Sequence, residues 1–155
     1  MEGGLDQPLE VRFRPTKGSA RESMLPVVPV VLVVDDESSV RELLRRWLDG
    51  WGYRVTEASR ATEALEVMLA GPASIILCDI RMPGHDGFWL LERVRERWPE
   101  TVIIMATGMD DIPTVVKSRE ARAVDYVVKP FGRELLRQAL NRANAALAIG
   151  SSLIK

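Results

Sequence analysis

The sequence predicts a doubly wound α/β fold, in which five parallel strands alternate with helices that cover both faces of the sheet. The first observation is a series of five strand-like runs, which begin at Val30, Tyr53, Ile75, Val102 and Val124. The second is that each gap has room for one helix and carries apolar residues at helical spacing. Strands that alternate with helices form βαβ units, whose strands are parallel.

The hydrophobicity of these runs indicates their order in the sheet. Residues 30–34, 75–78 and 102–106 are continuously apolar, as in strands covered on both faces. Residues 53–57 alternate with polar side chains and residues 124–128 include an aspartate, which is typical of edge strands. The pattern predicts the order 2-1-3-4-5, with functional residues at the carboxyl ends of the strands near the first and third.

The helices are predicted from apolar stripes and from residues that stop a helix. The third helix runs from about Gly87 to Trp98 and ends before Pro99, and a weaker fourth lies near residues 113–120. We expect Ser59 to cap the second helix. The stripes of the first, second and fifth helices are Val40, Leu43, Leu44, Trp47 and Leu48; Ala61, Ala64, Leu65, Met68 and Leu69; and Leu135, Leu136, Ala139, Leu140 and Ala143.

Composition favours a globular protein without a membrane or nucleic-acid role. The 155 residues carry a net charge of −1, and 46% of them are apolar. The single cysteine, Cys78, excludes a disulfide within the chain and favours a reducing compartment. No apolar stretch reaches the length of a membrane span, and no signal peptide is recognisable. We therefore expect a cytoplasmic protein with no membrane contact and no direct nucleic-acid binding.

The chain divides into an extension, a regular domain and a tail. Residues 1–28 are rich in glycine and proline and are expected to be an irregular extension. Leu9, Val11 and Phe13 alternate with polar residues as in a half-buried strand, but because the run is so short we expect an irregular arm rather than a strand. The regular domain covers residues 29–149, and residues 150–155 form the tail.

Charged and hydroxyl side chains stand where four of the predicted strands end. Asp35 and Asp36 follow the first strand, Asp79 the third, Thr107 the fourth and Lys129 the fifth. Parallel strands bring these ends to one edge of the sheet, where three carboxylates repel one another unless a cation neutralises them. Oxygen ligands without histidine or cysteine favour Mg²⁺. The sequence therefore predicts a magnesium site at this edge.

Four short motifs in this order resemble the receiver domains of bacterial response regulators. They are VVDD at 33–36, DIRMP at 79–83 with glycine at 87, TG at 107–108 and DYVVKPF at 125–131. The resemblance covers residues 30–147 and implies the doubly wound, flavodoxin-like fold. It also implies a signalling module that catalyses only its own phosphorylation and dephosphorylation, and is otherwise not an enzyme.

The resemblance implies roles for the residues at the strand ends. Asp79 is the expected phosphoacceptor, and Asp36 holds Mg²⁺ directly together with Asp79. Asp35 assists through metal-bound water, and the backbone carbonyl of Arg81 is the third protein ligand. An aspartate is ionised at neutral pH, so it attacks phosphorus without a general base.

The remaining roles concern the phosphoryl group and its effect. The resemblance implies that Thr107 and Lys129 each bond a phosphoryl oxygen, that Tyr126 is a switch residue, and that the Lys129–Pro130 bond is cis. The expected partners are a sensor histidine kinase or a phosphotransfer protein. A homodimer through the fourth helix, fifth strand and fifth helix is a further possibility. Arg122 stands where the family commonly has glycine, which puts the form of that surface in doubt.

The same fold also supports other functions. A pseudo-receiver, which binds partners without phosphorylation, is the main alternative, although the complete set of Asp36, Asp79, Thr107 and Lys129 argues against it. An aspartyl phosphatase would need a second acid at position 81, which is arginine. A flavin-binding protein would need a hydroxyl- and glycine-rich phosphate loop after the first strand. The sequence leaves open whether the chain is a single-domain regulator or the receiver of a longer one.

Overall fold

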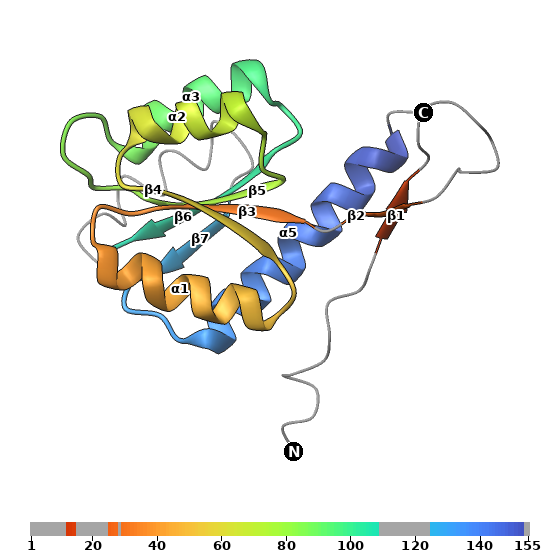
Figure 1. Ribbon diagram of the computed structural model, residues 1–155, viewed down its shortest axis with the longest axis horizontal. Helices are drawn as coiled ribbons and strands as arrows, with labels where there is room; N and C mark the ends of the chain where they lie inside the picture. Colours follow the sequence, from red (N-terminus) through yellow and green to blue (C-terminus); the bar gives the residue numbers. More distant parts are fainter. Residues whose placement is uncertain (1–11, 15–24, 28, 109–124, 154–155) are drawn as a thin grey trace.

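A computed structural model describes residues 12–14, 25–27, 29–108 and 125–153. Its main feature is a five-stranded parallel sheet in the order β4-β3-β5-β6-β7 (Figure 1). Counted along the chain from β3, this is the predicted order 2-1-3-4-5, with β4 and β7 at the edges. The strands are β3 Val30–Val34, β4 Arg54–Ala58, β5 Ile75–Asp79, β6 Val102–Thr107 and β7 Asp125–Val128.

Helices cover both faces of the sheet, as predicted. In Figure 1, α2 and α3 lie on one face, and α1 and α5 lie on the other. The weak fourth helix expected near residues 113–120, and Arg122, lie outside the described residues. The helices are α1 Ser38–Gly50, α2 Ala61–Ala70, α3 Gly87–Arg97 and α5 Arg133–Leu153.

Alternation along the central strands divides the core into two clusters. On β3, Leu32 and Val34 pack toward α2 and α3, whereas Val31 and Val33 pack toward α1 and α5. All four side chains are at most 1% exposed. Burial on both faces explains why β3, β5 and β6 are continuously apolar, because a central strand of a doubly wound sheet has no solvent-facing side.

The predicted apolar stripes lie on the buried faces of the helices, but each stripe includes one residue that is exposed to solvent. Leu43, Leu69 and Leu135 are 44%, 55% and 50% exposed, respectively. Each lies beside a buried neighbour at the margin of its stripe, so solvent reaches it although its spacing is that of the core. The prediction that Ser59 caps α2 is wrong, because the capping position is Arg60.

Ser59 instead bonds a side chain within the helix. Its backbone N–H and its hydroxyl both donate to the Glu63 carboxylate, at 2.7 and 2.9 Å. These two hydrogen bonds hold the pKa of Glu63 below its usual value. The carboxylate of the helix, rather than the serine oxygen, therefore satisfies the polar groups at this helix start.

The two ends of the chain are more regular than the sequence suggests. Residues Arg12–Arg14 form β1, which pairs in antiparallel fashion with β2, Leu25–Val27, as a separate two-stranded sheet. A strand in this arm therefore pairs locally and not along the open edge of the main sheet. The last helix, α5, continues to Leu153 and includes part of the predicted tail. Among the described residues, no helix has both the length and the apolar character that a membrane span requires.

Candidate functional site

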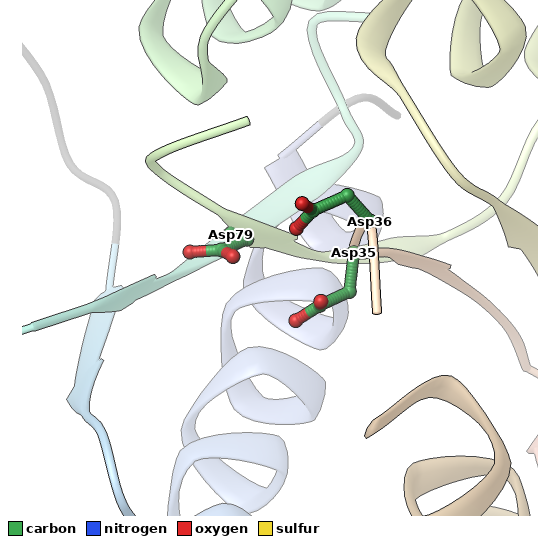
Figure 2. Close-up of side chains that lie close together, drawn as sticks. All are labelled: Asp35, Asp36 and Asp79. Atoms are coloured by element: carbon green, nitrogen blue, oxygen red, sulfur yellow. The ribbon is translucent and has the colours of Figure 1, made fainter. Parts of the chain in front are cut away.

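Three carboxylates meet at the carboxyl edge of the sheet, as the sequence predicts. Asp35 and Asp36 follow β3, and Asp79 is the last residue of the neighbouring strand β5 (Figure 2). One oxygen of each of the three side chains lies within 4.8 Å of the others. β3 and β5 are paired from Val31 to Val34, so the register of the sheet places these strand ends side by side.

Asp35 is a buried anchor, because every polar group that it offers has a partner. It is only 3% exposed. One carboxylate oxygen accepts the backbone N–H of Glu37 at 2.9 Å, and the other accepts Lys129 Nζ at 3.0 Å. The backbone N–H of Asp35 donates to the carbonyl of Ala58 at 3.1 Å. Asp36, by contrast, is exposed, and in Figure 2 its carboxylate extends toward the side of the cluster where Asp79 lies.

Lys129 bridges the two less exposed carboxylates. Its Nζ donates to Asp35 at 3.0 Å and to Asp79 at 3.2 Å. Burial lowers the pKa of Lys129, but the hydrogen bond to Asp35 and the charges of Asp79 and Asp35 outweigh it, so the pKa lies above its usual value. The backbone N–H of Lys129 donates to the carbonyl of Thr107 at 2.7 Å, and the Lys129–Pro130 bond is cis, as expected.

The charged form of Asp79 is disfavoured by its surroundings. Burial raises the pKa of Asp79, and the charge of Asp35 raises it further. Lys129 and the backbone N–H of Arg81 oppose this shift, but they do not cancel it. One lysine among three acids leaves an excess of negative charge, which a divalent cation would compensate.

The two proposed switch residues lie on β6 and β7. Thr107 is buried at the end of β6, and its hydroxyl donates to the carbonyl of Gly108 at 3.1 Å. Tyr126 lies opposite Met105 in the ladder of β6 and β7, and its half-buried ring packs against the cluster under α2 and α3. Thr107 therefore belongs to the same edge as the carboxylates, whereas Tyr126 lies one strand further out.

The loop between β5 and α3 is held close to the sheet. Gly87 opens α3, and a Cβ atom there would lie 2.7 Å from the backbone oxygen of Asp79 and 2.7 Å from the methyl carbon of Met105. Only glycine permits this approach. Asp86 caps α3 by accepting the backbone N–H of Trp89 at 2.9 Å. Gly84 takes up positive φ, +83°, which favours glycine at that turn.

A shallow hollow lies beside the exposed carboxylate of the cluster, that of Asp36. It has a volume of about 500 Å³ and lies between the β4–α2 and β5–α3 loops. His85, which the sequence suggests is a solvated loop residue, is exposed and stacks on Trp89 with ring centroids 3.8 Å apart. The residues that line the hollow are Asp36, Ser59, Arg60, Ala61, Thr62, Pro83, Gly84 and His85.

Sequence reasoning missed a pair of side chains behind the first carboxylates. Arg41 on α1 donates to the backbone carbonyl of Asp35 at 2.6 Å and to Glu57 on β4 at 3.3 Å. The only signal in the sequence was an arginine at the margin of an apolar stripe, which is indistinguishable from a solvated position. Cys78 is fully buried, and burial raises the pKa of its thiol.

The donor set fits Mg²⁺. The three carboxylates offer oxygen ligands only, and Asp36 is exposed and thus open to a hydrated ion. Both Asp35 oxygens already accept hydrogen bonds, so this residue suits an indirect role better than direct coordination. An oxygen-only site with one exposed carboxylate is what Mg²⁺ accepts, since this ion keeps several of its waters.

A doubly wound sheet with an acidic cluster at its carboxyl edge, faced by a threonine and a lysine, defines the class of phosphoryl-accepting signalling modules. The family comparison agrees. Residues 31–141 match the model of the response regulator receiver domain, and the chain belongs to this family. Receiver domains are signalling modules rather than conventional enzymes, and they work with histidine kinases or phosphotransfer proteins.

Individual relatives support the same conclusion. The chain is 46% identical over 102 residues to the hydrogenase transcriptional regulatory protein HoxA of Cupriavidus necator, covering 65% of this chain and 21% of that protein. It is 39% identical over 102 residues to the DNA-binding transcriptional regulator NtrC of Escherichia coli, covering 66% and 22%. This chain thus spans about a fifth of the length of these two relatives.

A solved structure reproduces the fold over almost its whole length. The chemotaxis protein CheY4 of Vibrio cholerae superposes with a TM-score of 0.70 at 30% identity, covering 76% of this chain and 99% of that one. The similarity therefore extends over the five-stranded sheet and its helices, which is the part of the chain that positions the acidic cluster.

Proposed function

We propose that Asp79 accepts a phosphoryl group from the phosphohistidine of a histidine kinase or phosphotransfer protein, in a reaction that requires Mg²⁺. The observation that carries the proposal is the cluster of Asp35, Asp36 and Asp79, bridged by Lys129 at 3.0 and 3.2 Å. A pseudo-receiver would have no need to bury the Asp35 carboxylate and partly bury Lys129 at this cost in desolvation.

Asp36, Asp79 and the backbone carbonyl of Arg81 would hold the ion, and Asp35 would assist from behind. Bound Mg²⁺ would neutralise charge on the phosphoryl oxygens, which is the main requirement of phosphoryl transfer. The saturated hydrogen bonds of Asp35 support its indirect role. The exposure of Asp36 supports direct contact with an ion that arrives from the solvent.

The chain's own residues supply the nucleophile and part of the charge stabilisation. An oxygen of Asp79 forms the new bond to phosphorus while the bond from phosphorus to the donor imidazole breaks, and the electron pair leaves with the imidazole. Lys129 already contacts Asp79, so it can move to a phosphoryl oxygen without crossing the site. Thr107 must give up its bond to Gly108 in order to reach the same group.

The signal would leave the site through that threonine. When Thr107 turns toward the phosphoryl group, the space behind the end of β6 opens to Tyr126 on the neighbouring strand. The proposed output surface includes β7 and α5, together with the fourth helix that the sequence predicts outside the described residues, and a homodimer through it is the expected readout. Coupling of 1–3 kcal/mol is typical for such linkage, which is about 5- to 150-fold in partner affinity. The names of HoxA and NtrC support a transcriptional output.

The test of the chemistry is intact mass after treatment with acetyl phosphate. We expect one phosphoryl adduct per chain in the presence of Mg²⁺, none in its absence, and none in Asp79→Asn. An adduct that persists in Asp79→Asn would place the acceptor elsewhere. Beryllofluoride with sedimentation then tests the output: the mimic should promote dimers in the wild type and fail to do so in Thr107→Ala.

A further inference from the structure

We propose that Arg41 is a positioning residue, which fixes the direction in which the Asp36 carboxylate leaves the chain and so sets the affinity of the site for Mg²⁺. This inference rests on the proposed metal site. It adds a residue of α1 that touches neither ion nor substrate, and it assigns a role to the Arg41–Glu57 pair behind the carboxylates.

The geometry starts with the contacts of the guanidinium group. Arg41 Nη1 donates to the backbone oxygen of Asp35 at 2.6 Å, while Nε donates to Glu57 at 3.3 Å. The Arg41 side chain is 18% exposed, so both contacts are largely shielded from solvent. Because the guanidinium is planar and its donors have fixed directions, the anchor on Glu57 determines where Nη1 points.

The contacted oxygen belongs to the peptide that joins Asp35 to Asp36. A peptide is planar, so a constraint on its oxygen also constrains its nitrogen and the Cα of Asp36. The other side of Asp35 is held by Ala58, whose carbonyl accepts the Asp35 N–H at 3.1 Å. Asp36 is itself exposed, so packing contributes little to its orientation. The direction of this carboxylate therefore depends mainly on the backbone, which Arg41 holds in place.

The charge of Arg41 and its positioning role have opposite effects on Mg²⁺ affinity, so the direction of the change on removing Arg41 distinguishes them. Arg41 is a cation close to a cation-binding cluster, so its charge alone disfavours Mg²⁺. Its removal would therefore tighten binding if charge were its only influence. If Arg41 aims Asp36, its removal weakens binding although a positive charge is lost.

The chain provides a matched control four residues further along α1. Arg45 donates to the other oxygen of Glu57 at 2.5 Å and to the backbone carbonyl of Val55 at 3.3 Å. It shares the helix, the charge and the carboxylate partner of Arg41, but these contacts lie on β4 and not on Asp35. Arg45→Gln therefore removes the same charge and a comparable ion pair without releasing the Asp35 peptide.

The experiment is a calorimetric titration with Mg²⁺ of wild type, Arg41→Gln, Arg41→Lys, Arg45→Gln and Asp36→Ala. We expect about tenfold weaker binding in Arg41→Gln, the lower end of the loss for a residue behind a ligand. Arg41→Lys keeps the charge but cannot span both partners, so it should fall between wild type and Arg41→Gln. Arg45→Gln should bind as tightly as the wild type or slightly more tightly.

A second readout is independent of the metal. In the ion-free protein the amide of Glu37, which bonds the Asp35 carboxylate, should exchange faster in Arg41→Gln but not in Arg45→Gln. If both Arg41 variants bind Mg²⁺ as tightly as the wild type or more tightly, while Asp36→Ala loses Mg²⁺ binding, the role of Arg41 is overturned and the proposed metal site is left intact. Unchanged binding in Asp36→Ala would instead overturn the metal site. Should Arg41→Gln fail to fold, the charge-retaining Arg41→Lys decides alone.

Discussion

The two turns that carry the acidic residues are held in place by different kinds of interaction. After β3, Asp35 is fixed by hydrogen bonds to Glu37, Lys129, Ala58 and Arg41, and the start of α1 has no side-chain cap. After β5, the loop is fixed by steric contact at Gly87 and by a conventional cap at Asp86. Polar bonds suit the turn that must hold buried charge, whereas close packing suits the loop that brings a helix against the strand end.

The largest expected effect comes from filling the contact on the β5 side. Gly87→Ala places a methyl group 2.7 Å from the Asp79 backbone oxygen and from Met105, so α3 must move outward. We expect a loss of about 3 kcal/mol in the free energy of unfolding, the upper end for overpacking. Urea denaturation measures it, with Gly132→Ala as control, because a Cβ there meets no atom within 4 Å. Equal costs for the two variants would contradict the steric account.

The second effect concerns the lysine that connects the two turns. Lys129→Met leaves Asp35 and Asp79 without their shared cation, and we expect it to cost about 2 kcal/mol in the absence of metal. The pKa of Lys129 in the folded protein lies above its usual value of 10.5. The stability that the charged lysine contributes is therefore complete below pH 10.5, and it is lost as the pH rises through the pKa of the folded protein. The difference in unfolding free energy between wild type and variant should shrink accordingly.

An exposed ion pair serves as the control for Lys129. Arg142 and Asp125 form such a pair at 2.6 Å, and the arginine side chain is 55% exposed. Arg142→Gln should cost less than about 1 kcal/mol. If it costs as much as Lys129→Met, the bridge between the turns has no special importance.

The third effect compares the helix starts directly. Asp86→Ala removes the bond to the Trp89 N–H and should destabilise the protein by about 1 kcal/mol. Glu37→Ala, at the matching position before α1, should change stability little, because its side chain makes no capping bond. Thermal unfolding of both variants tests the pair. A larger loss in Glu37→Ala would show that the two starts are capped alike.

The smallest effect has the opposite sign. Asp79→Asn should raise the melting temperature of the metal-free protein at neutral pH by a few degrees, because burial raises the pKa of Asp79 and makes its charged form unfavourable. A raised carboxyl pKa lowers stability as the pH rises from 3.8 through the folded value, so the advantage of the variant should vanish below pH 3.8. Mg²⁺ should stabilise the wild type but not the variant. A lower melting temperature in Asp79→Asn would mean that Lys129 outweighs burial.

The sequence was sufficient for the fold and for the edge where the site lies. Strand order followed from hydrophobicity because central and edge strands differ in how many faces they bury, and the ends of parallel strands necessarily share an edge. The contacts of Arg41 could not be predicted, since an arginine at a helix margin has the same spacing whether it is solvated or bonded. The cap of α2 was misassigned because Ser59 donates its N–H and its hydroxyl to the Glu63 carboxylate, whereas a capping serine would accept a backbone N–H of the helix. The pairing of β1 with β2 depends on contacts that alternation within one short run cannot show.

The buried thiol of Cys78, beside the site, allows local opening of the structure around β5 to be measured by chemical labelling. Cys78 is the only cysteine of the chain, has no exposed surface, and donates to the backbone oxygen of Asp79 at 3.2 Å. Since only a thiolate reacts and burial suppresses it, a thiol reagent can label this residue only when β5 separates from its covering helices. The labelling rate therefore measures how often the strand that carries Asp79 becomes exposed. Slower labelling with Mg²⁺ or beryllofluoride would show that binding at the acidic cluster also makes the exposure of β5 less frequent.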